Sequence, residues 1–199
     1  MLNQKIRGAW DVAMRPVGRG LAAAGIGPNA ITVVGVAVQV AVAWAIVAGR
    51  LVLAGVLAIV AALADTVDGA VAKARGSTGK LGALFDSTAD RLSDALFFVA
   101  IAWLYAASPD RRDQRWVAAL ALTALVASFL VSYVKARAEG LGFECNVGIA
   151  ERAERLILMI LGLLFADVLP FVLGVLATLA GVTVVQRFLH VRAQARGAA

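Results

Sequence analysis

Long hydrophobic segments alternate with short polar links along most of the chain. A helix needs about 20 mainly apolar residues to cross the roughly 30 Å hydrocarbon core of a membrane, because each residue advances the helix by about 1.5 Å. The apolar segments come near or above this length, apart from a short fifth one. The pattern predicts an all-α integral membrane protein with six transmembrane helices, at residues 30–49, 51–73, 84–107, 116–137, 154–167 and 169–190.

Residues 1–22 have a different pattern. Apolar residues recur there at every third or fourth position, and basic residues fill most of the remaining positions, as in a helix with one apolar face. The apolar residues are Leu2, Ile6, Trp10, Ala13, Val17 and Leu21, and the basic ones are Lys5, Arg7, Arg15 and Arg19. A basic amphipathic helix of this kind lies along the membrane surface. We therefore expect a single membrane domain over residues 1–199, with a juxtamembrane helix at 1–22 and a six-helix bundle at 23–199.

Composition supports a membrane protein and explains the positive charge. The chain is 61% hydrophobic with a mean hydropathy of +0.85, whereas a soluble domain is about 45–50% apolar. The net charge of +6 could suit nucleic acid, but the sequence lacks the aromatic-rich polar surface that single strands need. Basic residues also collect at cytoplasmic membrane faces, beside anionic lipid. We expect no nucleic-acid partner.

The distribution of basic residues predicts the orientation. Six spans place both termini on one side, with the 73–91 and 135–155 regions on that same side. These regions hold every Lys and Arg except Arg50, Arg111, Arg112 and Arg115. Because positive residues favour the cytoplasmic face, we expect the termini, and any site near these regions, to be cytoplasmic.

Four aspartates interrupt the apolar pattern between the second and third predicted helices. Asp65 and Asp68 are three residues apart, and Asp86 and Asp90 are four apart, so each pair shares a helix face. An ionised side chain at membrane depth costs roughly 2.5–3.5 kcal/mol on insertion scales. The link 76–82 could let two helices bring the four carboxylates together. Hard divalent cations such as Mg²⁺, Mn²⁺ or Ca²⁺ would offset their repulsion.

The same residues form a known signature. The chain has the pattern D-x2-D-G-x2-A-K-x8-G-x3-D-x3-D, through Asp65, Asp68, Gly69, Ala72, Lys73, Gly82, Asp86 and Asp90. This resembles the signature of the CDP-alcohol phosphotransferases, integral membrane enzymes of phospholipid synthesis. One position departs from it, because the family has Arg where this chain has Lys73. Lysine keeps the charge but lacks the bidentate fork that suits phosphate, so either Lys73 acts as a point charge or Arg75 takes part.

The resemblance implies roles for these residues. The four aspartates would bind two Mg²⁺ or Mn²⁺ ions, and Asp90 would also be the catalytic base. A CDP-lipid, CDP-diacylglycerol, would bind beside them. A pattern Pro-Asn-x-x-Thr before the first span, at residues 28–32, also resembles one found in the family near the nucleotide, although Pro-Asn is equally a common helix start. The residues implied for the CDP-lipid are Asn29, Thr32, Gly69, Ala72, Lys73, Gly79 and Gly82.

A basic cluster near residues 132–155 bears on the second substrate. The segments SYVKARAE and VGIAERAER resemble bacterial phosphatidylinositol-phosphate synthases of this family, whose acceptor is L-myo-inositol 1-phosphate. Guanidinium and ammonium groups would suit the acceptor's phosphate, and membrane topology alone would also place basic residues here. The implied acceptor residues are Lys135, Arg137, Arg152, Arg155 and Arg192, with Arg196 as an alternative to Arg192.

The reaction implied is transfer of a phosphatidyl group to inositol 1-phosphate with release of CMP, in a bacterial cell membrane and by a homodimer. A phosphatidylglycerophosphate synthase that uses glycerol 3-phosphate is the rival within the family. From another class, a cation-coupled transporter also carries intramembrane acids, but it more often has inverted repeats and helices broken at mid-membrane.

Other reactive residues add little. The single cysteine, Cys145, excludes an internal disulfide and a thiolate metal site. The single histidine, His190, is expected at the membrane interface rather than in catalysis. Asp94 lies one helical turn after Asp90, outside the signature, and we expect it either to support the metal ligands or to pair with Arg91.

Overall fold

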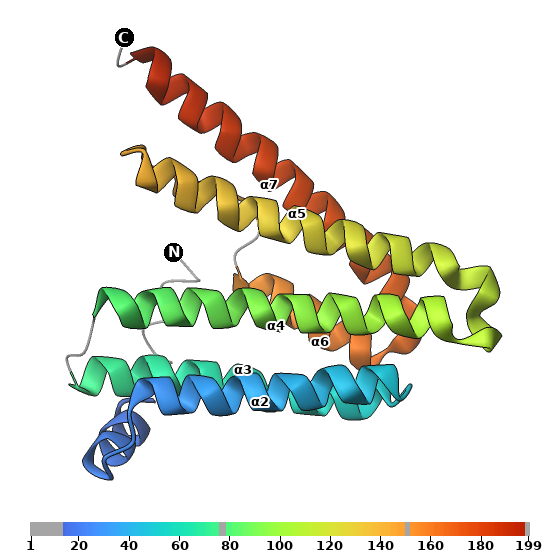
Figure 1. Ribbon diagram of the computed structural model, residues 1–199, viewed down its shortest axis with the longest axis horizontal. Coiled ribbons are helices and arrows are strands. Elements are labelled where there is room, and N and C mark those ends of the chain that lie inside the picture. The colour runs from blue at the N-terminus through green and yellow to red at the C-terminus, as the bar shows by residue number, and fades with distance from the viewer. Residues whose placement is uncertain (1–13, 76–78, 150–151, 198–199) are drawn as a thin grey trace. The chain divides into compact units, whose positions relative to one another are not determined.

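The computed structural model describes residues 14–75, 79–149 and 152–197, and these residues are helical, with no strand among them (Figure 1). Residues 14–23 form an N-terminal helix. The other helices are α2 (Pro28–Val47), α3 (Leu51–Arg75), α4 (Lys80–Ala107), η1 (Pro109–Gln114), α5 (Arg115–Gly140), α6 (Arg152–Leu164), η2 (Ala166–Val168) and α7 (Leu169–Gly197). A helix therefore lies at each of the six predicted places.

Local sequence explains several helix ends. Pro28 is the first residue of α2, a position where its missing N–H is not needed. Gly49 follows α2 with φ of 74°, and Gly142 follows α5 with φ of 85°, a left-handed conformation that costs glycine little. The third helix begins at Lys80, earlier than the predicted residue 84. Gly82 therefore lies inside α4 and not in the link.

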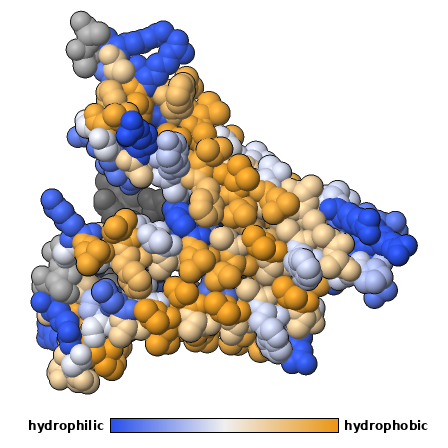
Figure 2. Space-filling model, viewed as in Figure 1, coloured by the Kyte–Doolittle hydropathy of each residue, from blue (hydrophilic) through white to orange (hydrophobic). Residues whose placement is uncertain are grey.

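Within the described residues, four helical segments are long and apolar enough to cross a membrane: Pro28–Val47, Leu51–Arg75, Pro109–Gly140 and Ala166–Gly197. Large exposed hydrophobic side chains such as Trp44, Trp103 and Phe171 lie on the outside, and Figure 2 shows hydrophobic residues over much of the visible surface. These features fit a membrane protein. The predicted count of six spans also needs α4, whose first half is charged, and α6, which has 13 residues. This count stays a prediction. The juxtamembrane helix at 1–22 stays a prediction too, because residues 1–13 lie outside the described ones.

The chain divides into two compact units. Unit 1 comprises Met1–Ala41 and Leu57–Ser93, and unit 2 comprises Val42–Val56 and Asp94–Ala199. Each of α2, α3 and α4 therefore contributes residues to both units. Unit 1 carries the predicted metal ligands, and unit 2 carries the predicted acceptor residues.

In unit 1 the N-terminal helix packs closely on α3. Gly18 is buried there, and a Cβ at this position would lie 2.7 Å from the carbonyl carbon and oxygen of Ala70. The guanidinium of Arg75 donates a hydrogen bond to the carbonyl of Ala22 (3.3 Å). The amide of Gln39, on α2, likewise donates to the carbonyl of Ser93 on α4 (3.3 Å). Side-chain bonds to backbone carbonyls thus join the helices of unit 1.

In unit 2 the longest contact runs between α5 and α7, with α6 also packed on α7 (Figure 1). Small residues of α5, Ala121 and Ala124, are fully buried, as are Leu173 and Leu176 of α7. Small residues on one helix let the larger side chains of the other approach closely, which is common where membrane helices pack together.

Candidate functional site

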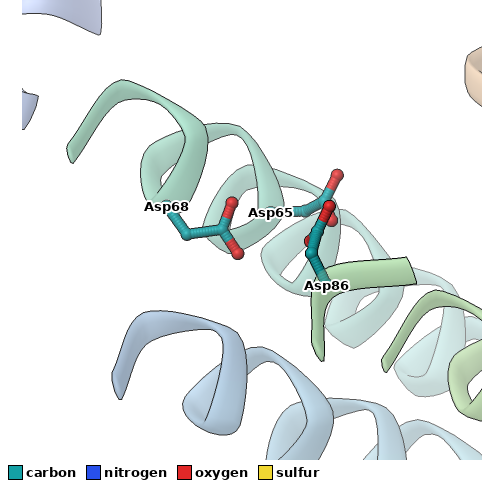
Figure 3. Close-up of side chains that lie close together, drawn as sticks. All are labelled: Asp65, Asp68 and Asp86. Atoms are coloured by element: carbon teal, nitrogen blue, oxygen red, sulfur yellow. The ribbon is translucent and has the colours of Figure 1, made fainter. Parts of the chain in front are cut away.

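Three of the four predicted metal ligands come together in unit 1. Asp65 and Asp68 lie on α3 and Asp86 lies on α4, and one carboxylate oxygen from each lies within 4.8 Å of the other two. Figure 3 shows the three carboxylates directed toward one another. Asp68 is buried (8% exposed), Asp65 is half-buried and Asp86 is exposed. We call this set the aspartate cluster.

The donor set of the aspartate cluster fits a hard divalent cation. Oxygen ligands of Mg²⁺ or Ca²⁺ lie about 2.0–2.6 Å from the ion, so two ligands of one ion are at most about 4–5 Å apart. The separations in the cluster are within or close to this range. Carboxylates held this near one another also repel, and a cation removes that repulsion. The cluster could therefore hold a divalent ion with small side-chain movements.

A hydroxyl group fixes the most buried member of the cluster. Thr32 Oγ1 donates a hydrogen bond to Asp68 Oδ2 at 2.8 Å, joining α2 to α3 across 36 residues of sequence. The sequence pattern grouped Thr32 with the CDP-lipid residues. In the structure Thr32 contacts a carboxylate of the cluster, so it can orient that carboxylate directly.

Asp90, the fourth predicted ligand, is not among the three clustered carboxylates. It lies one turn after Asp86 on α4, and its carboxylate forms an ion pair with Arg91 at 3.8 Å. The Asp90 side chain is only 15% exposed. The arrangement thus separates one acid, beside a cation, from three acids that face one another.

Three glycines among the predicted CDP-lipid residues border open space. A Cβ added at Gly69, Gly79 or Gly82 would meet no described atom within 4 Å beyond its chain neighbours and its own helix backbone, so packing against other parts of the protein does not require glycine at these positions. Asn29 is exposed at the start of α2, and Ala72 is half-buried on α3. Lys73 is exposed and lines a pocket together with two arginines of the N-terminal helix.

In unit 2 the predicted acceptor residues are paired with acids or exposed. Lys135 forms an ion pair with Glu139 (3.7 Å), one turn on in α5, and Arg155 forms one with Asp94 (3.9 Å). The side chains of Arg155 and Asp94 are only 12% and 13% exposed. Arg137 and Arg192 are exposed, and the side chain of Arg152 lies outside the described part of the chain.

Sequence analysis missed two side chains of α7 that hold the link after α5. Arg187 donates from Nε to the carbonyl of Val147 (2.9 Å) and from NH1 to the carbonyl of Val131. Gln194 accepts from the backbone N–H of Glu144 (3.1 Å) and donates to its carbonyl (2.6 Å). An arginine inside the last apolar segment was the available signal, because a charged group there needs polar partners.

Comparison with known proteins assigns these features to one group of enzymes. The model of the CDP-alcohol phosphatidyltransferase family matches residues 26–186. The chain is 38% identical to phosphatidylinositol phosphate synthase of Corynebacterium glutamicum over 195 residues, which is 95% of this chain and 88% of that protein. It is 35% identical to archaetidylinositol phosphate synthase of Pyrococcus horikoshii over 186 residues, 92% of this chain and 93% of that protein.

Solved structures agree with the sequence matches. Phosphatidylinositol phosphate synthase of Mycobacterium tuberculosis with CDP-DAG bound superposes with a TM-score of 0.81 at 34% identity, over 89% of this chain and 92% of that one. The same enzyme in complex with manganese and citrate gives a TM-score of 0.82 at 34% identity, over 89% of this chain and 88% of that one.

Proposed function

The chain belongs to the CDP-alcohol phosphatidyltransferase family, and from this premise we propose that it transfers the phosphatidyl group of CDP-diacylglycerol to a hydroxyl of L-myo-inositol 1-phosphate. The products are phosphatidylinositol phosphate and CMP. The observation that carries the proposal is the convergence of Asp65, Asp68 and Asp86 from the family signature. Relatives named phosphatidylinositol phosphate synthase support the choice of acceptor.

The aspartate cluster would hold the metal, and we propose Asp90 as a further ligand and two Mg²⁺ or Mn²⁺ ions in all. When bound, such ions stabilise negative charge on the phosphoryl group and on the leaving oxygen. Thr32, through its bond to Asp68, would keep one carboxylate in a fixed orientation, so less reorganisation is needed when the ligand set is complete. The complex of the M. tuberculosis enzyme with manganese supports divalent metal use.

Asp90 would act as the base. Its carboxylate lies beside Arg91 and would accept the proton of the acceptor hydroxyl. That hydroxyl oxygen then forms a bond to the phosphorus that carries the diacylglycerol. The bond from this phosphorus to the oxygen of CMP breaks, CMP leaves with the electron pair, and the proton stays on Asp90.

The CDP-lipid would lie over α3 and the start of α4. Gly69, Gly79 and Gly82 border open space, which supports close approach of the nucleotide to the backbone, because a side chain there would occupy the ligand's place. Ala72 would keep the same helix face thin. Asn29 would contact the nucleotide from the start of α2, and Lys73 the diphosphate.

The acceptor phosphate would bind Lys135, Arg137, Arg152, Arg155 and Arg192, all basic residues of unit 2. Arg155 is the best oriented of those whose side chains are described, because Asp94 contacts its guanidinium and both side chains are largely buried. The two parallel N–H donors of an arginine match the oxygens of a phosphate group. Serine and free inositol carry no phosphate, so an acceptor site for either would not need these arginines.

We place the enzyme in a bacterial cell membrane as a six-span, single-domain homodimer, with the site and both termini in the cytoplasm. The excess of Lys and Arg at the ends that carry the site supports this orientation. Four helical segments of membrane-spanning length support the membrane location.

The test is CMP release by the purified protein from CDP-diacylglycerol and Mg²⁺, with inositol 1-phosphate, glycerol 3-phosphate, inositol and serine offered separately. We expect release with inositol 1-phosphate alone, and its loss after chelation with EDTA. A preference for glycerol 3-phosphate would transfer the assignment to the rival synthase. No release with any acceptor, from folded protein with metal, would contradict the proposed function.

A further inference from the structure

A pocket of unit 2 lies at the turn between α4 and α5, where η1 joins the two helices (Figure 1). It has a volume of about 470 Å³, in the range of about 300–1,000 Å³ that is usual for small-molecule sites. Residues 47–49, at the end of α2, form part of its lining. The polar side chains of the lining are Ser108, Asp110, Arg111 and Gln114. We call this cavity the η1 pocket.

The η1 pocket lies where candidate membrane spans end. Val47 is the last residue of one candidate span, and Pro109, in η1, is the first residue of another. Three tryptophans are exposed on the helices that meet there, Trp44 (59%), Trp103 (62%) and Trp116 (56%). Two of them lie near the ends of α2 and α4, and the third lies in the first turn of α5. Because exposed tryptophans gather at the boundary between hydrocarbon and headgroups, the pocket lies at headgroup depth.

The guanidinium of Arg111 is held in this pocket by an aromatic ring. Its central carbon lies 4.8 Å from the centroid of the Tyr105 ring, and Tyr105 is only 1% exposed. Contact with a ring face leaves the N–H groups at the edge of the guanidinium able to form hydrogen bonds. Among the described residues, no acid or carbonyl pairs with these N–H groups. Arg111 is therefore an oriented cation that can bind an anion.

The same pocket also provides negative charge. Asp110 lies in η1, and its carboxylate pairs with no cation in the part of the chain that the structure describes. The last hydrogen bonds at the end of α2 use the carbonyls of Ala45 and Ile46. The carbonyls of residues 47–49 lie beyond these bonds, where a helix end carries partial negative charge. A Cβ at Gly49 would meet no described atom within 4 Å beyond its chain neighbours, so this wall borders open space.

A membrane lipid with both signs of charge suits this lining. A phosphate group has oxygens for Arg111, because arginine binds phosphate through two parallel N–H groups. A primary ammonium has three N–H donors for a carboxylate and for backbone carbonyls. Phosphate and primary ammonium occur together in the headgroup of an aminophospholipid such as phosphatidylethanolamine. A glycerol headgroup would bring no cation to Asp110.

The distribution of charge along the chain supports a specific role for Arg111. The basic residues outside the regions predicted to be cytoplasmic are Arg50, Arg111, Arg112 and Arg115. Positive residues are depleted at the other membrane face. An arginine that lies at that face and is also fixed in a pocket therefore indicates a partner more strongly than one of the many cytoplasmic cations does.

We propose that the η1 pocket binds the headgroup of an aminophospholipid from the leaflet at this end of the spans. The lipid phosphate binds Arg111 and Gln114, and the ammonium binds Asp110 and the carbonyls at the end of α2. The pocket shares no residue with the aspartate cluster or with the predicted substrate sites. The inference therefore does not depend on the proposed function.

The experiment measures the lipid that the purified protein retains in neutral detergent micelles, by native mass spectrometry. Phosphatidylethanolamine, phosphatidylcholine and phosphatidylglycerol are titrated separately. The variants are Arg111→Gln, Arg111→Lys, Asp110→Asn and Gln114→Glu, the last of which leaves the aromatic contact intact and adds an acid beside the expected phosphate. The matched controls are Arg112→Gln and Asp113→Asn, which change the same residue types in η1 outside the pocket lining.

We expect the native protein to bind phosphatidylethanolamine more tightly than the other two lipids. Arg111→Gln should weaken this binding about tenfold, as expected for loss of a charge-assisted hydrogen bond, and Arg111→Lys should recover part of the loss. Gln114→Glu should also weaken it, because an acid repels phosphate. Asp110→Asn should remove the preference for phosphatidylethanolamine over phosphatidylglycerol. Both controls should bind as the native protein does.

Three outcomes would overturn the proposal. The first is native binding by folded Arg111→Gln and Gln114→Glu. The second is an equal loss in Arg112→Gln, which would show a general attraction of lipid to positive charge. The third is a native preference among the lipids in Asp110→Asn, which would remove the ammonium from the site. No turnover is measured, so a chain that released no CMP would still give a decisive result.

Discussion

Two sets of charged groups, the aspartate cluster of unit 1 and the ion pairs of unit 2, are arranged in opposite ways. In unit 1, Asp65, Asp68 and Asp86 are brought within 4.8 Å of one another by two helices. In unit 2, basic residues meet acids of the protein, as Arg155 meets Asp94 and Lys135 meets Glu139. Carboxylates held this close repel one another, and a cation among them lowers that repulsion, whereas the two members of an ion pair attract each other. The first arrangement therefore indicates a ligand more strongly than the second.

The difference predicts how each unit responds to substitution. Removal of an acid from unit 1 removes part of a ligand site, and the loss is in chemistry. Removal of an acid from an ion pair of unit 2 weakens the hold on the basic side chain, and the loss is in stability and orientation. The following substitutions test this contrast, from the largest expected effect to the smallest.

Asp86→Asn should have the largest effect. It replaces one of the three clustered carboxylates with a neutral amide of the same shape. We expect CMP release to fall by about a thousandfold or more, because bound metal contributes several kcal/mol to transition-state stabilisation. Mg²⁺ should raise the melting temperature of the native protein and not that of the variant.

The control for Asp86→Asn is Asp167→Asn, an acid of η2 outside the cluster, which should keep native activity. Activity of Asp86→Asn within tenfold of native, with a native response of melting temperature to Mg²⁺, would contradict the role of the aspartate cluster.

The same contrast explains how much the sequence could predict. Asp65, Asp68 and Asp86 lie on two helices whose apolar pattern is strong, and the spacing of three between Asp65 and Asp68 predicts a shared face. Three of the four predicted carboxylates do lie together, and their role as metal ligands stays a prediction. The helices themselves lie at the predicted places, although α4 begins earlier and α7 ends later than expected. The number of membrane spans stays a prediction.

The contacts that sequence did not predict join elements far apart in the chain. Asp94 and Arg155 pair across 61 positions of sequence. The sequence suggested Arg91, a near neighbour, as the partner of Asp94. Arg15 and Arg19 were assigned to the membrane surface, because helical period shows which residues share a face and not which helix that face meets. Tertiary packing supplies this information.

Asp94→Asn tests unit 2 and should have the second largest effect. It replaces the carboxylate beside the largely buried Arg155 with a neutral amide, and we expect the free energy of unfolding to fall by about 1–3 kcal/mol, the usual cost of leaving a buried polar group less well compensated. The KM for inositol 1-phosphate should rise about tenfold while the KM for CDP-diacylglycerol and kcat change little.

Asp94 is a positioning residue in this account, so Asp94→Glu should recover part of the acceptor KM. Asp113→Asn, in η1, is the control. A variant that loses kcat and leaves the acceptor KM unchanged would place Asp94 with the aspartate cluster and remove the contrast between the two units.

Two glycines of unit 1 sharpen the comparison further. Gly69→Ala adds a methyl group where no protein atom lies within 4 Å, and alanine favours a helix by roughly 0.5–1 kcal/mol over glycine. We expect unchanged or higher stability and a KM for CDP-diacylglycerol raised severalfold. Gly18→Ala would instead meet the backbone of Ala70 and should lower stability, by about 1–3 kcal/mol. Equal losses of stability in the two variants, measured by thermal unfolding, would contradict a ligand-facing role for Gly69.

Glu139→Gln should have the smallest effect, because exposure decides what an ion pair contributes. The Lys135 and Glu139 side chains are 39% and 50% exposed, against 12% and 13% for Arg155 and Asp94. An exposed pair one helical turn apart contributes about 0.3–0.5 kcal/mol, so unfolding should barely change. The freed charge of Lys135 should lower the KM for inositol 1-phosphate up to about twofold, the factor that corresponds to an energy of this size. If Glu139→Gln lost as much stability as Asp94→Asn, burial would not explain a difference between the two ion pairs. Glu139 would then hold Lys135 as firmly as Asp94 holds Arg155.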